Sequence, residues 1–465
     1  MNGDVSLEGL TAAGLAGSDV AAWAKSNPRA TGGFAEDREA FAFYWRAANS
    51  LLARLPKKAR RSAAEQEAAE TIKQQARAAR IRFLNTHGEH LYDLLTRERS
   101  EFLRIDELAQ AASGVVPGLV PAPEQLKSEN ELPLRDREGV EIDHGLFLSA
   151  VLAGEVSGNH LCHAMLLPRR ESSGFLPEFA KSGLIDLGTA SVERKSNAAV
   201  VTIRNPRYLN AEDQTTIDAV EICVDIALLD PTAGVGVLRG GLVDHPKYKG
   251  RRVFGAGINL TQLYEGRIPY LWYLRRDLGF VHKLYRGLAR MDSPPDDVAG
   301  VTIEKPWIAA VEAFAIGGHC QLLLTMDYNI AERDAFMTLP ARKEGIIPGM
   351  ANMRLPRFTG DRIARQAILS ERHLPCDSPE GRLICDEIVE PGTMDTAIDR
   401  VVERLSSSGV VSAASNRRAM RVAQEPLAVF RSYCAAYARD QAFCHFSPAL
   451  IQNLERYWIA RSGTI

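Results

Sequence analysis

The chain has 465 residues, of which 46% are hydrophobic and 25% are charged. This mix is typical of globular proteins and excludes a largely disordered chain, and at roughly 150 residues per domain the length predicts two to four domains. Lysine and arginine number 56, and aspartate and glutamate 58, so the formal net charge is −2. Such a balance excludes a nucleic-acid-binding face that covers the whole protein, although it leaves local basic patches open.

The sequence also carries expectations about location. It contains no run of about 18 apolar residues that would cross a membrane. Met1 to Gly14 includes Asp4 and Glu8 and lacks the basic-then-apolar pattern of a signal peptide. The seven cysteines are scattered and form no CxxC motif. We therefore expect reduced thiols in a cytoplasmic protein.

Helical patterns fill the segment before residue 190. Ser62-Ala-Ala-Glu65 has the form of a capping box, and a stretch of strong helix formers follows it. Apolar residues then recur at helical spacing from Ile81 to Leu94. The proline- and glycine-rich segment from Val115 to Pro123 indicates a linker or loop, and helical patterning resumes from Leu146 to Leu167.

From Asn197 the pattern changes to strands that alternate with helices. Three apolar runs predict strands, at 198–203, 234–238 and 307–316. Helical spacing predicts helices over 213–229 and 271–288, and again from residue 395 almost to the end. Alternating strands and helices predict crossover connections and an α/β core.

The segment Ala315-Ile-Gly-Gly-His-Cys-Gln321 joins the end of a strand to a glycine pair and the start of a helix. The first N–H groups of a helix lack partners and carry partial positive charge, and glycine lets a ligand approach the backbone closely. Such a segment can bind an oxyanion. The same pattern also forms ordinary tight turns, so these residues alone leave both interpretations open.

Four segments together resemble the crotonase (enoyl-CoA hydratase/isomerase) superfamily over residues 197–400. In chain order they are Asn205-Pro-Arg-Tyr-Leu-Asn-Ala211, Phe254 to Ile258, Ala315 to Gln321 and Glu344-Gly-Ile-Ile-Pro-Gly349. The resemblance implies that two backbone N–H groups, those of Ile258 and Gly318, hold the thioester oxygen of an acyl-CoA. They would stabilise an enolate or a tetrahedral oxyanion.

Two positions depart from the hydratases of this superfamily. Those enzymes place one glutamate three residues after the oxyanion glycine and a second directly after the proline of the later loop. Here these positions hold Gln321 and Ala341. Neither side chain exchanges a proton at neutral pH, so we do not expect water addition by a carboxylate pair. An enolate can still form if the α-carbon of the substrate is acidic enough.

The pattern is similar to one branch of the superfamily, the cofactor-independent dioxygenases of glycopeptide-antibiotic pathways that act on 3,5-dihydroxyphenylacetyl-CoA. That branch has a long N-terminal helical extension, a Gly-Gly-x-Cys-Gln helix start and an aromatic/arginine helix like Trp272-Tyr-Leu-Arg-Arg276. The resemblance implies that Glu212, Arg276 and Gln321 contact the ring hydroxyls. Arg275 remains an alternative to Arg276, and each of the three can instead be an ordinary helix-surface residue.

Further residues are candidates for binding the substrate or CoA. The loop from His245 to Arg252 is basic and suits phosphates, although it can equally be a solvated charged loop. The resemblance also implies that the backbone of Ala256 holds the adenine. The full set of binding candidates is His245, Lys247, Tyr248, Lys249, Ala256, Gly257, Asn259, Gly317, His319 and Ala341.

Other constellations are weaker. The dense histidine segments, His87-Gly-Glu-His90 and His160-Leu-Cys-His163, lie in the helical extension, and we expect no metal site there. His319 can be a proton shuttle, but local packing or capping is the favoured interpretation. Cys320 lacks an evident base and is expected to be a buried thiol. Gly234-Val-Gly236 lacks the spacing of a dinucleotide motif.

These observations predict an α/β fold: a crotonase-type ββα spiral core (196–392), an N-terminal helical domain (1–195) and a C-terminal helical segment (393–465). The expected activity is metal- and cofactor-free dioxygenation of 3,5-dihydroxyphenylacetyl-CoA, with CoA thioester and O2 as substrates. Alternatives are a thioester hydrolase with the same oxyanion hole and a non-catalytic acyl-CoA-binding subunit. The resemblance also implies a homo-oligomer, a trimer or hexamer, and no nucleic-acid or membrane partner.

Overall fold

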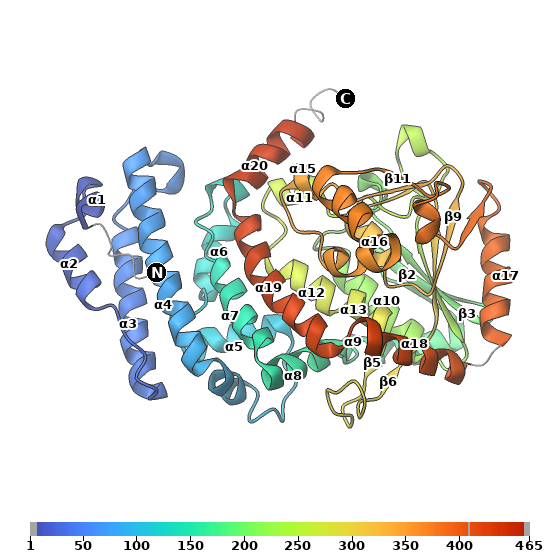
Figure 1. Ribbon diagram of the computed structural model, residues 1–465, viewed down its shortest axis with the longest axis horizontal. Helices are drawn as coiled ribbons and strands as arrows, with labels where there is room; N and C mark the ends of the chain where they lie inside the picture. The colour runs from blue at the N-terminus through green and yellow to red at the C-terminus, as the bar shows by residue number, and fades with distance from the viewer. Residues whose placement is uncertain (1–6, 408–409, 460–465) are drawn as a thin grey trace. The chain divides into compact units, whose positions relative to one another are not determined.

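The computed structural model describes residues 7–407 and 410–459 (Figure 1). The first six residues of the segment tested for a signal peptide lie outside this range. Contacts group the described chain into two compact units. The first contains residues up to Leu161 with Pro269–Leu271 and Cys434–Pro448, and the second contains Cys162–Ile268, Trp272–Tyr433 and the residues from Ala449. The three-segment division expected from the sequence stays a prediction.

The first unit is helical. Its longest helix, α4, begins at the predicted capping box: Ser62 Oγ accepts from Glu65 N at 3.3 Å, and Glu65 Oε2 accepts from Ser62 N at 2.7 Å. Buried aromatic residues such as Trp45 and Phe83 pack between α3 and α4. The helices are α1 (Leu7–Ala12), α2 (Gly17–Lys25), α3 (Phe34–Leu52), α4 (Ala63–Leu95), α5 (Ile105–Val115), α6 (Pro123–Asn130) and α7 (Ile142–Ala153), with the short turns η1 (Lys58–Arg60) and η2 (Leu134–Asp136). Helix α8 (Glu155–Leu166) runs from the first unit into the second.

The second unit is built on a seven-stranded sheet of order β1-β2-β3-β4-β7-β9-β12. Strands β3, β4, β7, β9 and β12 are parallel, as expected for crossover connections, whereas β1 and β2 are antiparallel. The strands are β1 (Leu184–Asp186), β2 (Ala190–Lys195), β3 (Ala198–Ile203), β4 (Val235–Gly240), β7 (Trp307–Val311), β9 (Tyr328–Glu332) and β12 (Glu387–Val389). Two smaller sheets pair β5 (Leu288–Ala289) with β6 (Thr302–Ile303), and β10 (Phe336–Thr338) with β8 (Phe314–Ile316) and β11 (Leu374–Pro375).

Helices cover this sheet. Helix α17 lays Ile398, Val401 and Val402 on the apolar side chains of the parallel strands, which forms one core cluster. The helices of this unit are α9 (Arg170–Ser182), α10 (Ile217–Leu229), α11 (Leu260–Tyr264), α12 (Leu271–Leu278), α13 (Phe280–Arg286), α14 (Gly318–Leu323), α15 (Ala341–Glu344), α16 (Ala351–Ser370), α17 (Met394–Ser407), α18 (Val410–Gln424) and α20 (Pro448–Leu454). Short turns η3 (Pro206–Tyr208), η4 (Pro246–Tyr248) and η5 (Gly381–Leu383) join them, and α19 (Leu427–His445) belongs to both units.

Two predicted elements are divided in the structure. The strand expected over 307–316 is β7 and β8, because Ala313 adopts a left-handed conformation (φ 65°) that turns the chain into a different sheet. The helix expected over 271–288 is interrupted at Gly279, whose dihedral angles (φ −88°, ψ −116°) are not helical. Apolar spacing could not reveal either break, because all of the fragments are buried.

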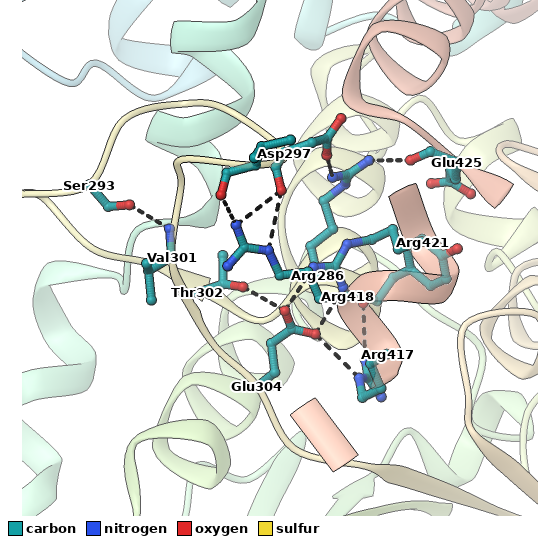
Figure 2. A network of polar contacts seen from close by, with 12 residues as sticks. Arg286, Ser293, Asp297, Val301, Thr302, Glu304, Arg417, Arg418, Arg421 and Glu425 are labelled. Carbon is teal, nitrogen blue, oxygen red and sulfur yellow. Dashed lines mark hydrogen bonds and ion pairs between the residues drawn. The ribbon is translucent and has the colours of Figure 1, made fainter. Parts of the chain in front are cut away.

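Figure 2 shows a buried network that fixes α18 to the segments around β6. The Glu304 carboxylate accepts from both terminal nitrogens of Arg421, at 2.8 and 2.7 Å. Asp297 accepts from Arg286 Nη1 at 2.7 Å and from the Leu427 backbone N–H at 2.6 Å. These polar contacts, and not the exposed faces of α18, hold the helix in place.

Within the described residues, no helix is long and apolar enough to cross a membrane. In the same part of the chain, no group of three or more His, Cys, Asp or Glu side chains is arranged to hold a metal ion.

Candidate active site

The two loops that carry the predicted oxyanion amides lie against each other in the second unit. Gly255 bridges to Ala315 in parallel register, so the loop after β4 runs beside β8. Gly257 has φ +78°, and a Cβ atom there would lie 2.8 Å from the Ile316 carbonyl oxygen and 3.2 Å from Gly318 N. Glycine at 257 therefore allows a close approach that a side chain would block.

Several backbone N–H groups around this contact donate to acceptors within the protein, and others do not. The protein supplies acceptors for four of them: Ala256 (Leu209 O, 3.1 Å), Gly257 (His319 Nδ1, 3.1 Å), Asn259 (Glu212 O, 2.8 Å) and Gly317 (Thr338 O, 2.9 Å). The N–H groups of Ile258 and Gly318 donate to no acceptor in the part of the chain that the structure describes. Gly318 is the first residue of α14, so its N–H has no partner within the helix. The N–H groups of His319 and Cys320, in the first turn of the same helix, likewise have no acceptor among the described residues. The amides of Ile258 and Gly318, the two positions expected from the sequence, are thus available for an oxyanion.

Glu212 and Arg276 form a buried ion pair beside these amides. Arg276 Nε lies 3.0 Å from Glu212 Oε1, and Arg276 Nη2 lies 2.9 Å from Glu212 Oε2. Glu212 itself is fixed by its backbone, whose N–H donates to the Gly257 carbonyl at 2.7 Å. A Cβ atom on Gly318 would lie 2.6 Å from Glu212 Oε2, so the pair lies against the start of α14.

Arg276 also joins Gln321 to the same group. Its Nη1 donates to Gln321 Oε1 at 2.9 Å and to Asp277 Oδ1 at 2.8 Å, and its Nη2 donates to the Gly318 carbonyl at 2.8 Å. Burial lowers the pKa of the guanidinium, but the neighbouring carboxylates of Glu212 and Asp277 outweigh burial and raise the pKa overall. Arg276 is therefore a fixed cation, and the Gln321 amide nitrogen keeps its donors free of any acceptor among the described residues.

Arg275 does not share this position. Its Nη2 contacts Asp218 Oδ1 at 2.5 Å on the neighbouring helix α10. The structure thus brings together Glu212, Arg276 and Gln321, and separates Arg275 from them.

His319 is buried behind the oxyanion loop. Its Nδ1 accepts the Gly257 N–H, and its ring meets Phe254 edge-to-face at 5.7 Å. Burial is the main cause that lowers the pKa of His319 to about 4, and the Arg276 charge adds to it, so the ring is neutral at pH 7. Of the two expected interpretations, the contacts match local packing and capping.

The basic loop from His245 to Arg252 contains both exposed side chains and side chains packed against the protein. Lys247 and Lys249 are exposed, and Lys247 lies over the Tyr248 ring, 5.2 Å from its centroid. Tyr248 in turn packs edge-to-face on Phe314, and His245 Nδ1 accepts from Lys247 N at 3.2 Å. The loop therefore presents the exposed side chains of Lys247 and Lys249 beside an aromatic anchor.

The remaining binding candidates contribute backbone or shape. Asn259 caps α11, because its Oδ1 accepts from Gln262 N at 3.2 Å. Its Nδ2 donates to Asp213 Oδ2 at 2.9 Å. Gly317 is the N-cap of α14, and Ala341 begins α15 and is half-buried. None of these three side chains supplies a proton-transferring group.

Asp277 is a member of this group that the sequence did not indicate. It follows Arg276 directly, and adjacent helical residues do not normally face each other, so its spacing carries no signal. The contact arises because α12 ends at Leu278 and the chain turns at Gly279.

The constellations set aside in the sequence have structural partners. His87 Nε2 lies 2.7 Å from Asp37 Oδ2, and His163 Nε2 lies 3.1 Å from the Arg290 carbonyl oxygen. Burial raises the pKa of the Cys320 thiol to about 12, which disfavours the nucleophilic thiolate at neutral pH.

Comparison with known proteins fits this geometry. Residues 193–429 match the family model described as enoyl-CoA hydratase/isomerase. The chain is 45% identical over 407 residues to a (3,5-dihydroxyphenyl)acetyl-CoA 1,2-dioxygenase from Amycolatopsis orientalis, which covers 87% of this chain and 92% of that protein. The chain belongs to the enoyl-CoA hydratase/isomerase family. The resemblance inferred from four sequence segments, and the crotonase-type α/β fold with helical additions at both ends, are confirmed.

Other relatives are less similar in sequence and cover a smaller part of this chain. A short-chain-enoyl-CoA hydratase from Clostridium acetobutylicum is 25% identical over 238 residues, 51% of this chain and 82% of that enzyme. The crystal structure of an enoyl-CoA hydratase/isomerase from Xanthobacter autotrophicus Py2 shares 23% identity, with a TM-score of 0.49, over 60% of this chain and 97% of that chain.

Proposed function

We propose that this protein is a cofactor-independent dioxygenase that converts 3,5-dihydroxyphenylacetyl-CoA and O2 into 3,5-dihydroxyphenylglyoxylate and CoA. The observation that carries the proposal is the 45% identity over 87% of the chain to a protein named for dioxygenation of that thioester. The two unpaired amides at Ile258 and Gly318 supply the matching chemistry.

In this proposal the thioester oxygen accepts hydrogen bonds from Ile258 N–H and Gly318 N–H. The Cα–H bonds of an arylacetyl thioester are acidic, because the carbanion is delocalised over the carbonyl and the ring. One oxyanion donor is typically worth roughly 2.7–4 kcal/mol in the transition state, so two donors favour the enolate strongly.

The carbanion then transfers an electron to O2, and the resulting pair combines to form a Cα peroxide. The terminal peroxide oxygen attacks the thioester carbonyl and expels CoA as a thiolate. Cleavage of the O–O bond, with loss of the second Cα proton, leaves a ketone at Cα and a carboxylate. Both oxygen atoms enter the product, and the two Cα protons leave with CoA and to solvent.

The polar group beside the amides would orient the ring. The Gln321 amide nitrogen has donors free for one hydroxyl, and the Glu212–Arg276 pair offers both an acceptor and a cation for another. Ala341 places a methyl group where hydratases have a carboxylate, so no negative charge there opposes formation of the carbanion.

The same proposal extends to the CoA portion and the surroundings. Lys247 and Lys249 would contact its phosphates, and the Ala256 carbonyl would accept from the adenine. We propose that no metal or organic cofactor takes part, and that the active form is a homo-oligomer. The described cysteines form no disulfide, which favours a reducing compartment such as the cytoplasm.

The test is oxygen consumption after addition of 3,5-dihydroxyphenylacetyl-CoA to purified protein treated with a strong chelator. The proposal expects one O2 consumed for each CoA released, with both oxygen atoms of labelled O2 recovered in the arylglyoxylate. Release of CoA without oxygen uptake would instead indicate a thioester hydrolase. Binding without turnover would indicate a non-catalytic acyl-CoA-binding subunit.

A further inference from the structure

The helical unit contains a cavity of about 580 Å³ that is separate from the core site. All of its lining residues fall between 49 and 143, so every wall belongs to the first unit. One wall is the face of α4 that carries Lys73, Arg77 and Arg80, at spacings of four and three residues. Leu52 and Leu55 contribute an apolar wall from the end of α3 and the segment after it. The volume lies within the usual range for small-molecule sites, roughly 300–1,000 Å³.

The lining carries five cationic side chains, three of them on α4, and four carboxylates, those of Glu124, Glu129, Glu138 and Asp143, so one positive charge is in excess. The side chains of Lys73, Arg77 and Arg80 are 9%, 10% and 8% exposed. Lys73 has its own partners, Glu70 at 2.7 Å and Glu138 at 3.2 Å. Arg77 and Arg80 share a single carboxylate, that of Asp143.

The contacts with Asp143 are loose. Arg77 Nε lies 3.5 Å from Asp143 Oδ1, which accepts no hydrogen bond, and Arg80 Nη2 lies 3.1 Å from Oδ2. Burial lowers the pKa of the Arg80 guanidinium, Asp143 opposes this, and the charge of Arg77 lowers it further. Two buried guanidinium groups with one shared counter-ion are costly, and a further anion would reduce that cost.

The guanidinium groups of Arg77 and Arg80 also have N–H donors that form no hydrogen bond with the residues that the structure describes. Arg77 donates Nη2 to the Gly139 carbonyl, and Arg80 donates Nε to the carbonyls of Gly118 and Leu119. The Nη1 groups of both arginines have no hydrogen-bond acceptor within the described chain. Two forks of donors at one wall suit the several oxygens of a phosphate.

Two further basic residues, Lys57 and Arg61, line the cavity next to η1, within the sequence Lys57-Lys-Ala-Arg-Arg61. Arg61 contacts Glu138 at 2.6 Å, whereas the Lys57 side chain is exposed and forms no ion pair with the described residues. A phosphate deep in the cavity would leave room for an apolar body against Leu52 and Leu55.

We propose that this cavity binds an organic phosphate of nucleotide size, with its phosphate between Arg77 and Arg80 and its uncharged body against the apolar wall. The CoA nucleotide and a free nucleotide share this chemistry. The site does not depend on the proposed dioxygenase activity, since no residue of the core contributes to it.

The test is isothermal titration calorimetry of the full chain with AMP, inorganic phosphate and benzoate as separate probes. We expect saturable binding of AMP and weaker or equal binding of inorganic phosphate, with no binding of benzoate. CoA titrated after saturation with AMP distinguishes the two sources: loss of one of two binding events indicates that CoA also enters the cavity, and an unchanged CoA isotherm assigns it to a free nucleotide.

Variants locate the site. Arg77→Gln should weaken AMP binding at least tenfold, and Lys57→Gln, at an exposed side chain that should not disturb folding, should weaken it about threefold. Lys25→Gln, at an exposed side chain of α2, none of whose residues lines the cavity, is the matched control and should bind as the parent does. Absence of AMP and phosphate binding, AMP binding that survives in both cavity variants, or binding of benzoate alone would overturn the proposal.

Discussion

At the scale of single residues, the decisive feature is the division of the backbone N–H groups into those that have an acceptor in the protein and those that do not. Ala256, Gly257, Asn259 and Gly317 donate their N–H groups to protein acceptors, whereas those of Ile258 and Gly318 have no acceptor among the described residues, and we predict that these two bind the substrate. His319 contributes to this division, because its neutral Nδ1 accepts the Gly257 N–H and so fixes the peptide that precedes Ile258. We therefore predict that His319 acts as a positioning residue and not as a proton shuttle.

His319→Leu should therefore lower kcat more than it raises KM. The change leaves the buried Gly257 N–H without an acceptor, which costs about 1–3 kcal/mol and lets the loop move. We expect kcat to fall about tenfold to a hundredfold, below the full loss of an oxyanion donor. His319→Asn, whose Oδ1 can occupy the place of Nδ1, should recover most of the rate. Steady-state oxygen uptake checks both variants, and equal losses in the two would contradict the positioning role.

The parent protein and His319→Asn also give a prediction about how the stability of the fold depends on pH. The pKa of His319 is about 4 in the folded protein, against about 6.5 in the unfolded chain. Between these values the unfolded state binds the extra proton, so the native protein loses stability as pH falls from 6.5 to 4. The Asn variant lacks this proton. The stability of the parent relative to His319→Asn should fall by about 1.4 kcal/mol for each pH unit in that window, as measured by urea unfolding, and a constant difference would contradict it.

Gln321 tests the polar group beside the amides. Gln321→Glu places a third carboxylate on Arg276, which already holds Glu212 and Asp277, and removes the free amide donors. We expect oxygenation to fall at least tenfold while the protein remains folded by circular dichroism, because the new charge opposes carbanion formation. Unchanged turnover would show that Gln321 has no part in the reaction.

The residue scale also shows what sequence can and cannot predict about a site. Ile258 and Gly318 could be proposed from motifs in which the backbone itself supplies the donors, and Gln321 from its fixed spacing to Gly318. The choice between Arg275 and Arg276 could not be made in this way, because both lie one residue apart on α12 and only packing decides which faces the loop. Asp277 was missed for the same reason.

At the scale of elements, buried ion pairs compensate for weak apolar patterning. Helix α18 buries no apolar side chain among its described residues, and it lies on the second unit through the buried Arg417 and Arg421 (Figure 2). The Glu304 carboxylate is 3% exposed, and it receives Arg421 at 2.7 Å and Arg417 at 3.4 Å. Arg421 lowers the pKa of Glu304 against the effect of burial, so this carboxylate is ionised in the folded protein.

Glu304→Gln should destabilise the protein by about 3–5 kcal/mol, because it leaves the buried Arg421 guanidinium without its counter-charge and removes one of the two carboxylates that contact Arg417, the other being Asp327. Urea unfolding at pH 7 measures the change. Asp361→Asn is the control, since Asp361 forms an exposed pair with Arg365 on α16 and such pairs contribute about 0.3–0.5 kcal/mol. Similar effects of the two substitutions would show that the network of Figure 2 adds little to stability.

Sequence patterns predicted the elements better than their connections. The strands at 198–203 and 234–238 and the capping box of α4 were found close to their observed bounds, because period and capping are local properties. The division of 307–316 was not, since it depends on Ala313 adopting a positive φ so that β8 can pair with β10. That pairing is a property of the tertiary structure.

At the scale of the whole molecule, the chain returns to its first unit late in the sequence. The segment Cys434–Pro448 of α19 and Pro269–Leu271 belong with the N-terminal helices. Gly145 lies so close to this segment that a Cβ atom there would be 2.5 Å from Ala442 Cβ, and Tyr270 OH donates to the Ala438 carbonyl. Helical periodicity predicted the helix but not its partner, because an apolar face does not specify which surface covers it.

This topology predicts that the chain from residue 162 onward does not fold alone. Removal of 1–161 would expose Ala438, Ala442 and His445, which are fully buried, and would strip Tyr270 of Glu141, which accepts its backbone N–H at 2.8 Å. We expect the truncated protein to aggregate or to lack a cooperative thermal transition, and coexpression of 1–161 as a separate chain to restore part of the folded yield. Light scattering and differential scanning calorimetry of the two preparations measure this. A monodisperse, cooperatively melting 162–465 fragment that turns over substrate would contradict the prediction, and it would show that the N-terminal helices serve a purpose other than completing the fold.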